Sequence, residues 1–180
     1  SGLEGYEEIS VVAMSAVSSS ARFRRGDHHL FVKRLTSRSM QSEPQIEAFK
    51  HEIVLLAALD GRGTPSLVAS GSDREGLYLA TEWSDFPSLA GRRIDVSMIR
   101  SLVDVLAVVS EAEGAGGPLS IVHGDLSPAN VLLSRDGRTA FLVDFGLARS
   151  RVYHPSPRTF RGTVAYAAPE VARGEAPTHA

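Results

Sequence analysis

The order of strand-like and helix-like segments is the feature that most limits the folds open to this chain of 180 residues. Short runs rich in β-branched and alternating apolar residues indicate strands, whereas apolar residues at i, i+3, i+4 and i+7 indicate a helix. The expected strands lie at 9–12, 21–23, 30–35, 67–68, 77–82, 131–133 and 140–143, and the expected helices at 42–61 and 96–109. A β-rich first half is therefore followed by a part that contains more helix.

Composition and charge narrow the class of protein. With 43% apolar and 22% charged residues, the chain has the make-up of a globular domain, and we expect a single domain over 1–180. A net charge of −2 argues against a mainly electrostatic partner, so neither nucleic acid nor a membrane is expected. The absence of cysteine excludes disulfides and thiolate metal sites, and it fits a cytoplasmic location.

Two polar motifs in the second half of the chain carry the chemistry. Residues 123–130 read HGDLSPAN, and Asp144 follows nineteen positions after Asp125, before a Phe and a Gly. Such a set suits phosphoryl transfer, in which one Asp deprotonates a hydroxyl while Asn130 and the second Asp hold magnesium on nucleotide phosphates. An ordinary loop with side-chain caps is the alternative for the spacing between Asp125 and Asn130.

Together these motifs resemble the catalytic and metal-binding loops of the eukaryotic-type protein kinase family. The resemblance implies an α+β, protein-kinase-like two-lobed fold, with a five-stranded N-lobe sheet and one helix over 1–83 and a partial, mainly helical C-lobe over 84–180. It implies ATP and Mg²⁺ as cofactors, Asp125 as the catalytic base, and Asn130 and Asp144 as metal ligands. It also implies that His123 packs near the Phe after Asp144 and has no catalytic role.

The resemblance assigns an ion pair to the first half of the chain. Lys33 lies on the third expected strand and Glu52 nineteen residues later on the first expected helix. In the family such a pair aims the lysine at the nucleotide phosphates, so both are expected in the catalytic site. A solvated surface side chain is the alternative for either residue alone. Glu43 and Glu47 compete on the same helix, but Glu52 lies at the edge of the apolar face.

Four further positions are expected at the nucleotide by resemblance. Thr81 falls where the family places its gatekeeper residue, and Glu82 and Trp83 fall where backbone groups bond to adenine. Leu132 falls where a side chain forms the floor under the base. Packing in a core is the alternative for each of them.

The segment 162–170 resembles the end of an activation segment in the Ser/Thr-directed branch of the family, in which the hydroxyl of Thr163 contacts the catalytic Asp. Small-molecule kinases such as aminoglycoside phosphotransferases share the HGD motif but not the Ala-Pro-Glu ending of this segment. Upstream of it, Ser150, Ser156 and Thr159 are candidate phosphorylation sites, and a basic loop that is never modified is the alternative.

Two departures from the family concern the expected nucleotide-binding site. The loop 13–20 contains no glycine, although glycines normally let the backbone approach the phosphates. Phe31 lies two residues before Lys33, and strand alternation puts both side chains on the same face. The ring of Phe31 is therefore expected to point at the adenine pocket and to fill part of it.

Two more departures concern the second half. Gly124 and Ser127 stand where the family has Arg and Lys, which removes the partner for a phosphorylated loop and a phosphate-neutralising charge. The chain stops at Ala180, so the apolar face of the helix at 96–109 is expected to need cover from a partner chain or from a missing C-terminal segment.

The best interpretation is a bacterial Ser/Thr protein kinase that transfers the γ-phosphate of ATP to a hydroxyl of a protein substrate. One rival is a pseudokinase, an interaction module with weak or no nucleotide binding. The other is a small-molecule kinase of the aminoglycoside type.

Overall fold

The computed structural model describes residues 2–153 and 163–173. The chain forms two compact units: unit 1 comprises 1–61 and 65–84, and unit 2 comprises 62–64 and 85–180. The segment 62–64 belongs with unit 2 because Gly63 lies against the side chains of Val105 and Val109, and its carbonyl oxygen accepts a hydrogen bond from the Leu142 N–H. The interpretation of the whole chain as one domain stays a prediction.

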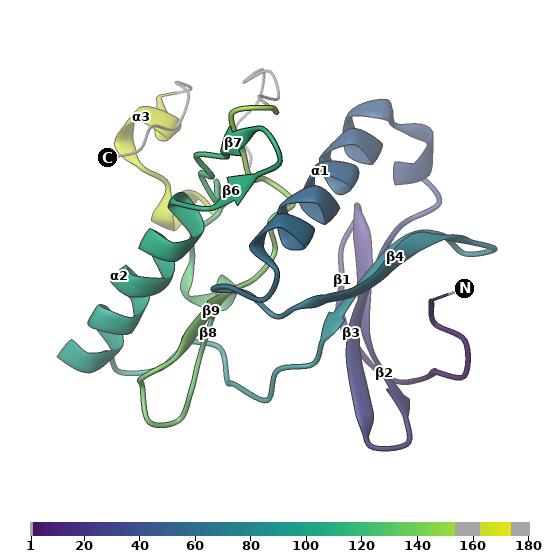
Figure 1. Cartoon of the computed structure of the whole chain (residues 1–180), viewed down its shortest axis with the longest axis horizontal. Coiled ribbons are helices and arrows are strands. Elements are labelled where there is room, and N and C mark those ends of the chain that lie inside the picture. Colours follow the sequence, from purple (N-terminus) through teal and green to yellow (C-terminus); the bar gives the residue numbers. More distant parts are fainter. Residues whose placement is uncertain (1, 154–162, 174–180) are drawn as a thin grey trace. The chain divides into compact units, whose positions relative to one another are not determined.

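Unit 1 is built on a five-stranded sheet in the order β1-β2-β3-β5-β4 (Figure 1). Each pair of neighbouring strands is antiparallel, and the helix α1 (Glu43–Leu59) connects β3 to β4. The strands are β1 (Glu7–Met14), β2 (Ser18–Arg25), β3 (His28–Leu35), β4 (Leu67–Asp73) and β5 (Gly76–Glu82). All five lie where the sequence predicts strands, which confirms the fold class expected for this part of the chain.

The strand register divides the side chains of this sheet between two faces. Lys33 lies opposite Leu79 of β5, and Phe31 lies opposite Thr81. Because residues two apart on a strand share a face, Lys33 and Phe31 lie on the same face, as expected. The other face carries a hydrophobic core formed by Leu3, Leu30, Val32, Tyr78 and Ala80.

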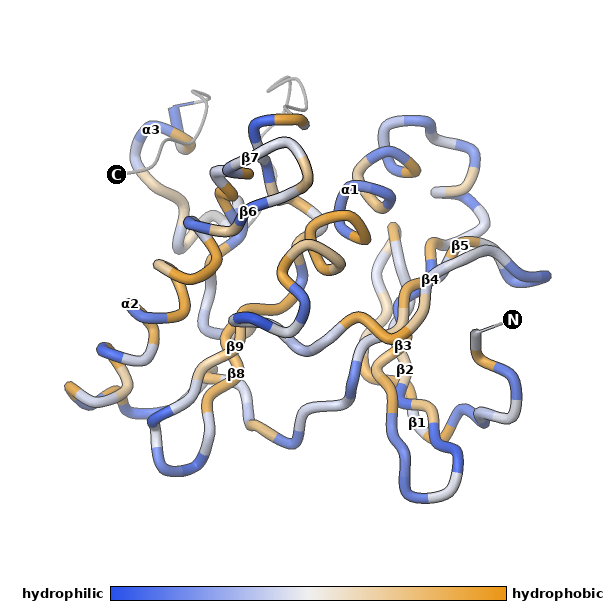
Figure 2. The backbone as a smooth tube through the Cα atoms, in the orientation of Figure 1, coloured by the Kyte–Doolittle hydropathy of each residue, from blue (hydrophilic) through white to orange (hydrophobic). Residues whose placement is uncertain are grey.

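The side that helix α1 buries differs in part from the apolar pattern expected at 42–61. Its start is favoured by Pro44 in the first turn, and Asp60 ends it in the left-handed conformation. Hydrophobic residues recur along the helix (Figure 2). The side chains that it buries are Phe49, His51, Glu52, Leu55, Leu56 and Leu59, whereas Ile46 and Ile53 are half-buried. Burial of Glu52 on this side demands a charge partner.

Unit 2 contains the helix α2 (Val96–Ser110), and Asp95 caps its start by accepting a hydrogen bond from the Met98 N–H. Two short hairpins follow. They pair β6 (Glu113–Gly114) with β7 (Gly117–Pro118) and β8 (Val131–Leu133) with β9 (Ala140–Leu142). The remaining elements are the 3₁₀ turns η2 (Pro128–Asn130) and η3 (Val164–Tyr166) and the short helix α3 (Pro169–Ala172). In the described part of the chain, no helix combines the length and the apolar character that crossing a bilayer requires.

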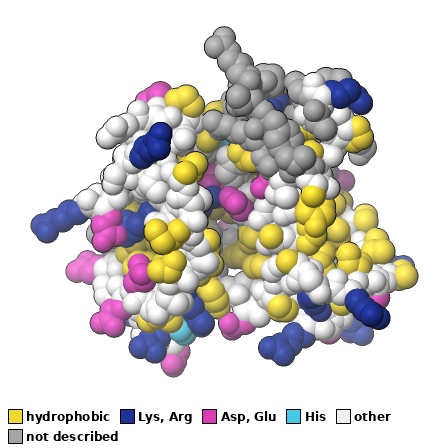
Figure 3. Space-filling view, turned by 180° about the vertical axis from the view of Figure 1, so that it is seen from behind, with side chains coloured by type: hydrophobic (Ala, Val, Ile, Leu, Met, Phe, Trp, Pro, Cys, Tyr) yellow, Lys and Arg dark blue, Asp and Glu magenta, His cyan; other side chains and the backbone are white. Residues whose placement is uncertain are grey.

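The apolar face expected on α2 is buried only in part. The helix buries Ser101, Val105 and Val109, whereas Ile99 and Val103 are more than half exposed. Hydrophobic side chains accordingly lie on the surface of unit 2 (Figure 3). The sequence showed a wide apolar stripe, but burial depends on which side of the helix the rest of the unit covers, and one side of the stripe is left exposed.

Candidate functional site

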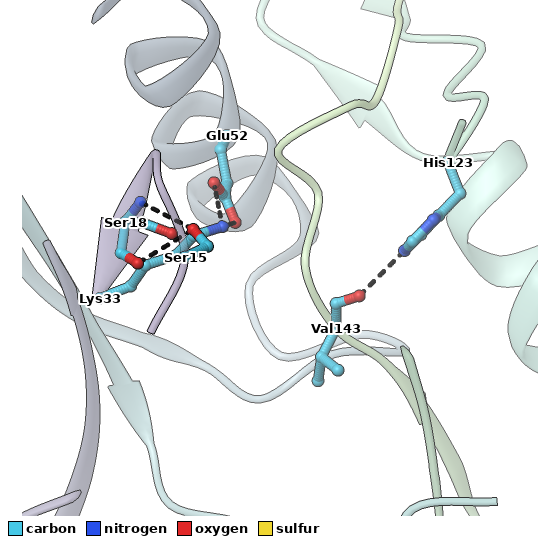
Figure 4. A network of polar contacts seen from close by, with 6 residues as sticks. All are labelled: Ser15, Ser18, Lys33, Glu52, His123 and Val143. Carbon is cyan, nitrogen blue, oxygen red and sulfur yellow. Dashed lines mark hydrogen bonds and ion pairs between the residues drawn. The ribbon is translucent and has the colours of Figure 1, made fainter. Parts of the chain in front are cut away.

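Unit 1 contains the expected ion pair between Lys33 and Glu52. The ammonium nitrogen of Lys33 lies 2.9 Å from both carboxylate oxygens of Glu52 (Figure 4). The exposed fractions of the two side chains are 11% and 4%. β3 supplies the lysine and α1 the glutamate. The competing Glu47 bonds instead to Lys50 on the surface of α1, so the structure selects Glu52.

The glycine-free loop forms a tight turn between β1 and β2 that is closed by a serine hydroxyl. The Oγ of Ser15 accepts hydrogen bonds from the N–H of Val17 at 3.2 Å and of Ser18 at 3.0 Å (Figure 4 draws the bonds between Ser15 and Ser18). The N–H of Ser15 donates to the carbonyl oxygen of Ser18 at 2.9 Å. Each backbone N–H carries a single hydrogen, so three amides of this turn already have an internal acceptor.

A second contact fixes the carbonyl groups of the same turn. The N–H of Thr36, which follows β3, donates to the carbonyl oxygen of Val17 at 3.0 Å. The hydroxyl of Thr36 donates to the carbonyl oxygen of Ala16 at 3.1 Å. The turn is therefore held by hydrogen bonds at both its N–H groups and its carbonyl groups. These bonds maintain the turn without the backbone freedom that glycines would give.

The residues expected to contact adenine lie at the end of β5. Thr81 is buried, and its hydroxyl donates to the carbonyl oxygen of Glu82 at 3.3 Å. The N–H of Glu82 donates to the Ser66 carbonyl, and the N–H of Trp83 donates to the His29 carbonyl. Both amide hydrogens are thus used inside unit 1. Among the backbone groups of Glu82, the carbonyl oxygen has a second lone pair to offer to a ligand.

Sequence analysis missed Arg22, which lies beside this segment on β2. Its guanidinium carbon lies 4.4 Å from the centre of the Trp83 ring, and its Nε donates to Nδ1 of His29 at 3.1 Å. Strand alternation could have placed Arg22 on one face of β2, but only the pairing of β2 with β3 shows that this is the face of Lys33.

Unit 2 brings Asp125 and Asn130 together around η2. The side-chain amide nitrogen of Asn130 donates to the carbonyl oxygen of Asp125 at 2.9 Å and to its carboxylate at 3.3 Å. The other carboxylate oxygen accepts a bond from the backbone N–H of Thr163 at 2.8 Å, where the family resemblance implied a contact from the hydroxyl of Thr163. These bonds orient the Asp125 carboxylate. They use the side-chain nitrogen of Asn130, so its side-chain oxygen is the atom that can serve as a metal ligand.

Asp144 follows β9 and is placed by the neighbouring backbone. The N–H of Val143 donates to the carbonyl oxygen of Asn130 at 3.0 Å, so the residue before Asp144 lies beside Asn130. Asp144 has a φ of 64°, a left-handed conformation that Asp tolerates better than most residues. Strain of this kind concentrates at functional sites.

His123 has the packing role that was expected of it. Its ring lies 4.9 Å from the ring of Phe145 at an angle of 54°. Its Nε2 donates to the carbonyl oxygen of Val143 at 3.0 Å (Figure 4). His123 and Asn130 therefore hold Val143 from two sides, through its carbonyl and its N–H, and so support the segment that leads to Asp144.

The donor set of unit 2 fits magnesium that is bound together with a phosphate group. The amide oxygen of Asn130 and the carboxylate of Asp144 are hard oxygen donors, which Mg²⁺ prefers. Among the described residues there is no group of three or more His, Cys, Asp or Glu side chains that could hold a metal. Two protein ligands suit Mg²⁺, because this ion usually keeps several waters and takes further ligands from substrate phosphates.

One of the departures in the second half, Gly124, has a structural reason. Gly124 has a φ of 80°, and a Cβ atom there would collide with the carbonyl oxygen of Leu147, so the arginine of the family cannot be accommodated without a backbone shift. Ser127 is buried, and its carbonyl oxygen accepts a bond from the Asn130 N–H.

The remaining predicted positions vary in their surroundings. Leu132 lies half-buried on β8, paired with Phe141 of β9. Ser150 is 1% exposed, which argues against its modification in this conformation. Ser156 and Thr159 lie outside the described residues.

Unit 1 thus has the five-stranded sheet and the Lys–Glu pair expected of a protein-kinase N-lobe, and unit 2 carries the side chains that were expected as the base and the oxygen ligands. Comparison with known families agrees: the protein kinase domain matches residues 13–180. The chain therefore belongs to the eukaryotic-type protein kinase family.

Individual relatives include both Tyr-directed and Ser/Thr-directed kinases. Tyrosine-protein kinase MasK of Myxococcus xanthus is 29% identical over 165 residues, which cover 83% of this chain and 25% of MasK. Serine/threonine-protein kinase AtPK2/AtPK19 of Arabidopsis thaliana is 26% identical over 182 residues, covering 97% of this chain and 38% of the relative. Probable serine/threonine-protein kinase PknB of Lactococcus lactis is 28% identical over 176 residues, covering 93% and 27%. The chain spans less than two-fifths of the length of these relatives.

Proposed function

We propose that this chain is the kinase part of a Ser/Thr protein kinase that transfers the γ-phosphate of ATP to a hydroxyl of a protein substrate. The observation that carries the proposal is the Asp125 carboxylate, oriented by the Asn130 amide and the Thr163 N–H in one conformation. A base acts efficiently only when it is positioned, because the proton that it removes lies in one direction.

Asp125 is the group that accepts the proton of the substrate hydroxyl. As the hydroxyl oxygen forms its bond to the γ-phosphorus, the bond from that phosphorus to the β–γ bridging oxygen breaks and ADP leaves. The proton passes to the Asp125 carboxylate. Asn130 positions this base and, with Asp144, offers the oxygen ligands for Mg²⁺, which when bound neutralises charge on the phosphates.

Unit 1 contributes the positioning of the nucleotide. Glu52 holds the Lys33 ammonium in one place, and that ammonium is the charge that we assign to the phosphates of ATP. Thr81, the carbonyl oxygen of Glu82 and the segment at Trp83 are assigned to the base. Leu132 keeps its assignment to the base from the family resemblance. A protein substrate and a cytoplasmic location are parts of this proposal, and neither nucleic acid nor a membrane is a proposed partner.

The exposed side of α2 is proposed to be covered in the working protein, by a partner chain or by further residues of the same protein. Ile99 and Val103 are apolar and more than half exposed, and a contiguous apolar surface of that kind marks an interface.

The test compares two aspartates of unit 2. Transfer of radioactive phosphate from Mg-ATP to Ser/Thr peptide pools is measured for the wild type, for Asp125→Asn and for Asp104→Asn, an exposed carboxylate on α2. Loss of the base should lower transfer by about 10²–10⁴-fold, and Asp104→Asn should leave it unchanged. Transfer that does not depend on Asp125 would refute the proposal, and phosphorylation of a metabolite with none of the peptides would favour a small-molecule kinase.

The internally bonded turn at Ser15 favours a second candidate function, that of a pseudokinase used for interaction. Two amides that could approach phosphates are bonded to the Ser15 hydroxyl instead. If the wild type binds no Mg-ATP and Phe31→Ala restores binding, this second function is the correct one.

A further inference from the structure

Arg22 makes two contacts that hold its side chain flat against the nucleotide-binding face of unit 1. The guanidinium carbon lies 4.4 Å from the centre of the Trp83 ring, a cation–π contact. The Nε donates to Nδ1 of His29 at 3.1 Å. The planar guanidinium is stacked on the indole ring and tethered by a hydrogen bond, so its conformation is restricted. The side chain is therefore held against this face, and it is half-buried.

The strand register places Arg22 beside the residues assigned to the base. Arg22 lies opposite Phe31, which lies opposite Thr81, so the three side chains form one row across β2, β3 and β5. The next row along contains Ser20, Lys33 and Leu79. Side chains directly opposite each other in an antiparallel sheet lie on one face within contact distance. Arg22 and Phe31 thus stand one row from the lysine assigned to the phosphates.

We propose that Arg22 occupies the place of the nucleotide base in unit 1, and that a purine must displace the guanidinium from Trp83 in order to bind. The inference rests on the proposed function, which assigns Thr81 and the backbone of Glu82 and Trp83 to the base, and it adds a role for the Trp83 ring. It adds a residue that decides affinity: the Arg22 side chain is an internal competitor of ATP, and nucleotide binding is coupled to its release.

The competition has a physical basis in shape and in stacking. A guanidinium and a purine are both flat groups that stack on aromatic rings, so they compete for the same surface. Release of Arg22 forfeits one cation–π contact and one hydrogen bond before the base gains its own contacts. A cation–π contact alone corresponds to a factor of about two to thirty in affinity, depending on how far it is shielded from water.

The opposite role for Arg22 makes an opposite prediction. If Arg22 bound the nucleotide through its positive charge, its removal would weaken the binding of a polyanion such as ATP. The sign of the change in affinity therefore separates competition from attraction.

The experiment uses the full 180-residue chain and a fluorescent ATP analogue in the presence of Mg²⁺, with binding followed by anisotropy. Arg22→Ala is compared with Arg24→Ala, which removes the same charge from the same face of β2, two residues further along. We expect Arg22→Ala to bind about two- to thirtyfold more tightly than Arg24→Ala. Equal or weaker binding of Arg22→Ala, or no binding by either variant, would overturn the inference.

Trp83 supplies a second readout, because it is the only tryptophan in the chain. Without nucleotide, Arg22→Ala should change the emission of Trp83 and Arg24→Ala should not. An unchanged emission in Arg22→Ala would show that the stacked contact does not exist.

The two readouts also separate this inference from the proposed function. Nucleotide binding by Arg22→Ala but not by the wild type would support the competition while removing the case for an active kinase. Phosphate transfer that depends on Asp125, together with equal affinity of the two Arg variants, would leave the proposed function standing and refute the competition.

Discussion

Removal of Glu52 should destabilise unit 1 far more than removal of a surface carboxylate from the same helix. Glu52 supplies the negative charge for both of its bonds to Lys33, and the two side chains are 4% and 11% exposed. Glu52→Gln leaves a buried ammonium without that charge, and breaking a buried pair in this way typically costs about 3–5 kcal/mol. The control Glu47→Gln breaks an exposed pair with Lys50 and should cost about 0.5 kcal/mol or less.

The assay is urea unfolding followed by the emission of Trp83, which lies in unit 1. For a chain of this size, 3–5 kcal/mol also corresponds to a fall in Tm of roughly 6–20 °C. A double variant, Lys33→Met with Glu52→Leu, should recover most of the loss, because an apolar pair of similar volume carries no buried charge. The reasoning is refuted if Glu52→Gln costs less than about 1 kcal/mol, or if the double variant is as unstable as the sum of the two single variants.

Three further changes test other parts of the structure. Ser15→Ala frees the N–H groups of Val17 and Ser18, so Mg-ATP should bind several-fold more tightly. The control Ser10→Ala on β1 should not change the affinity. A weaker affinity in Ser15→Ala would contradict the internal bonding. Gly124→Ala should lower the free energy of unfolding by about 2 kcal/mol or more, because φ is 80° and the Leu147 carbonyl blocks a Cβ. The control Gly116→Ala should cost little, because there is open space around that residue. Equal effects of the two substitutions would exclude the collision. Arg34 donates a 2.8 Å hydrogen bond to Asp73 and lowers the pKa of that carboxyl. The stability that this ion pair adds to the fold is therefore present above the unfolded-state pKa of Asp73, and it disappears as the pH falls through the lower folded-state pKa. Asp73→Asn should therefore destabilise the protein at pH 7 and have little effect at pH 2, and a loss that is the same at both values would refute the ion pair.

The positions of strands and helices followed from sequence because local patterns encode them. Apolar alternation and turn residues act within a few positions, and the expected strands at 30–35 and 77–82 are those of the structure within two residues. The packing of His123 against Phe145 was likewise predicted, because the family resemblance of the two motifs that contain these residues implies it.

The buried side of α2 could not be predicted in the same way. Its sequence offers apolar residues over a wide arc, and Ile99 and Val103 fit a core as well as Val105 and Val109 do. Which of them is buried depends on what the rest of unit 2 places against the helix, and a periodicity contains no information on that.

By itself the sequence supplied the chemical groups that we assign to the reaction: Asp125, Asn130 and Asp144 to the base and the metal, and Lys33 with Glu52 to the phosphates. Those assignments come from residue types, their spacing and the resemblance to the kinase family, because the functional groups are properties of the side chains. The tertiary structure decided what surrounds them. Arg22 on Trp83 and the hydroxyl of Ser15 on its own turn are non-local or geometric contacts, and they exist because strand register and turn conformation bring particular atoms within bonding distance.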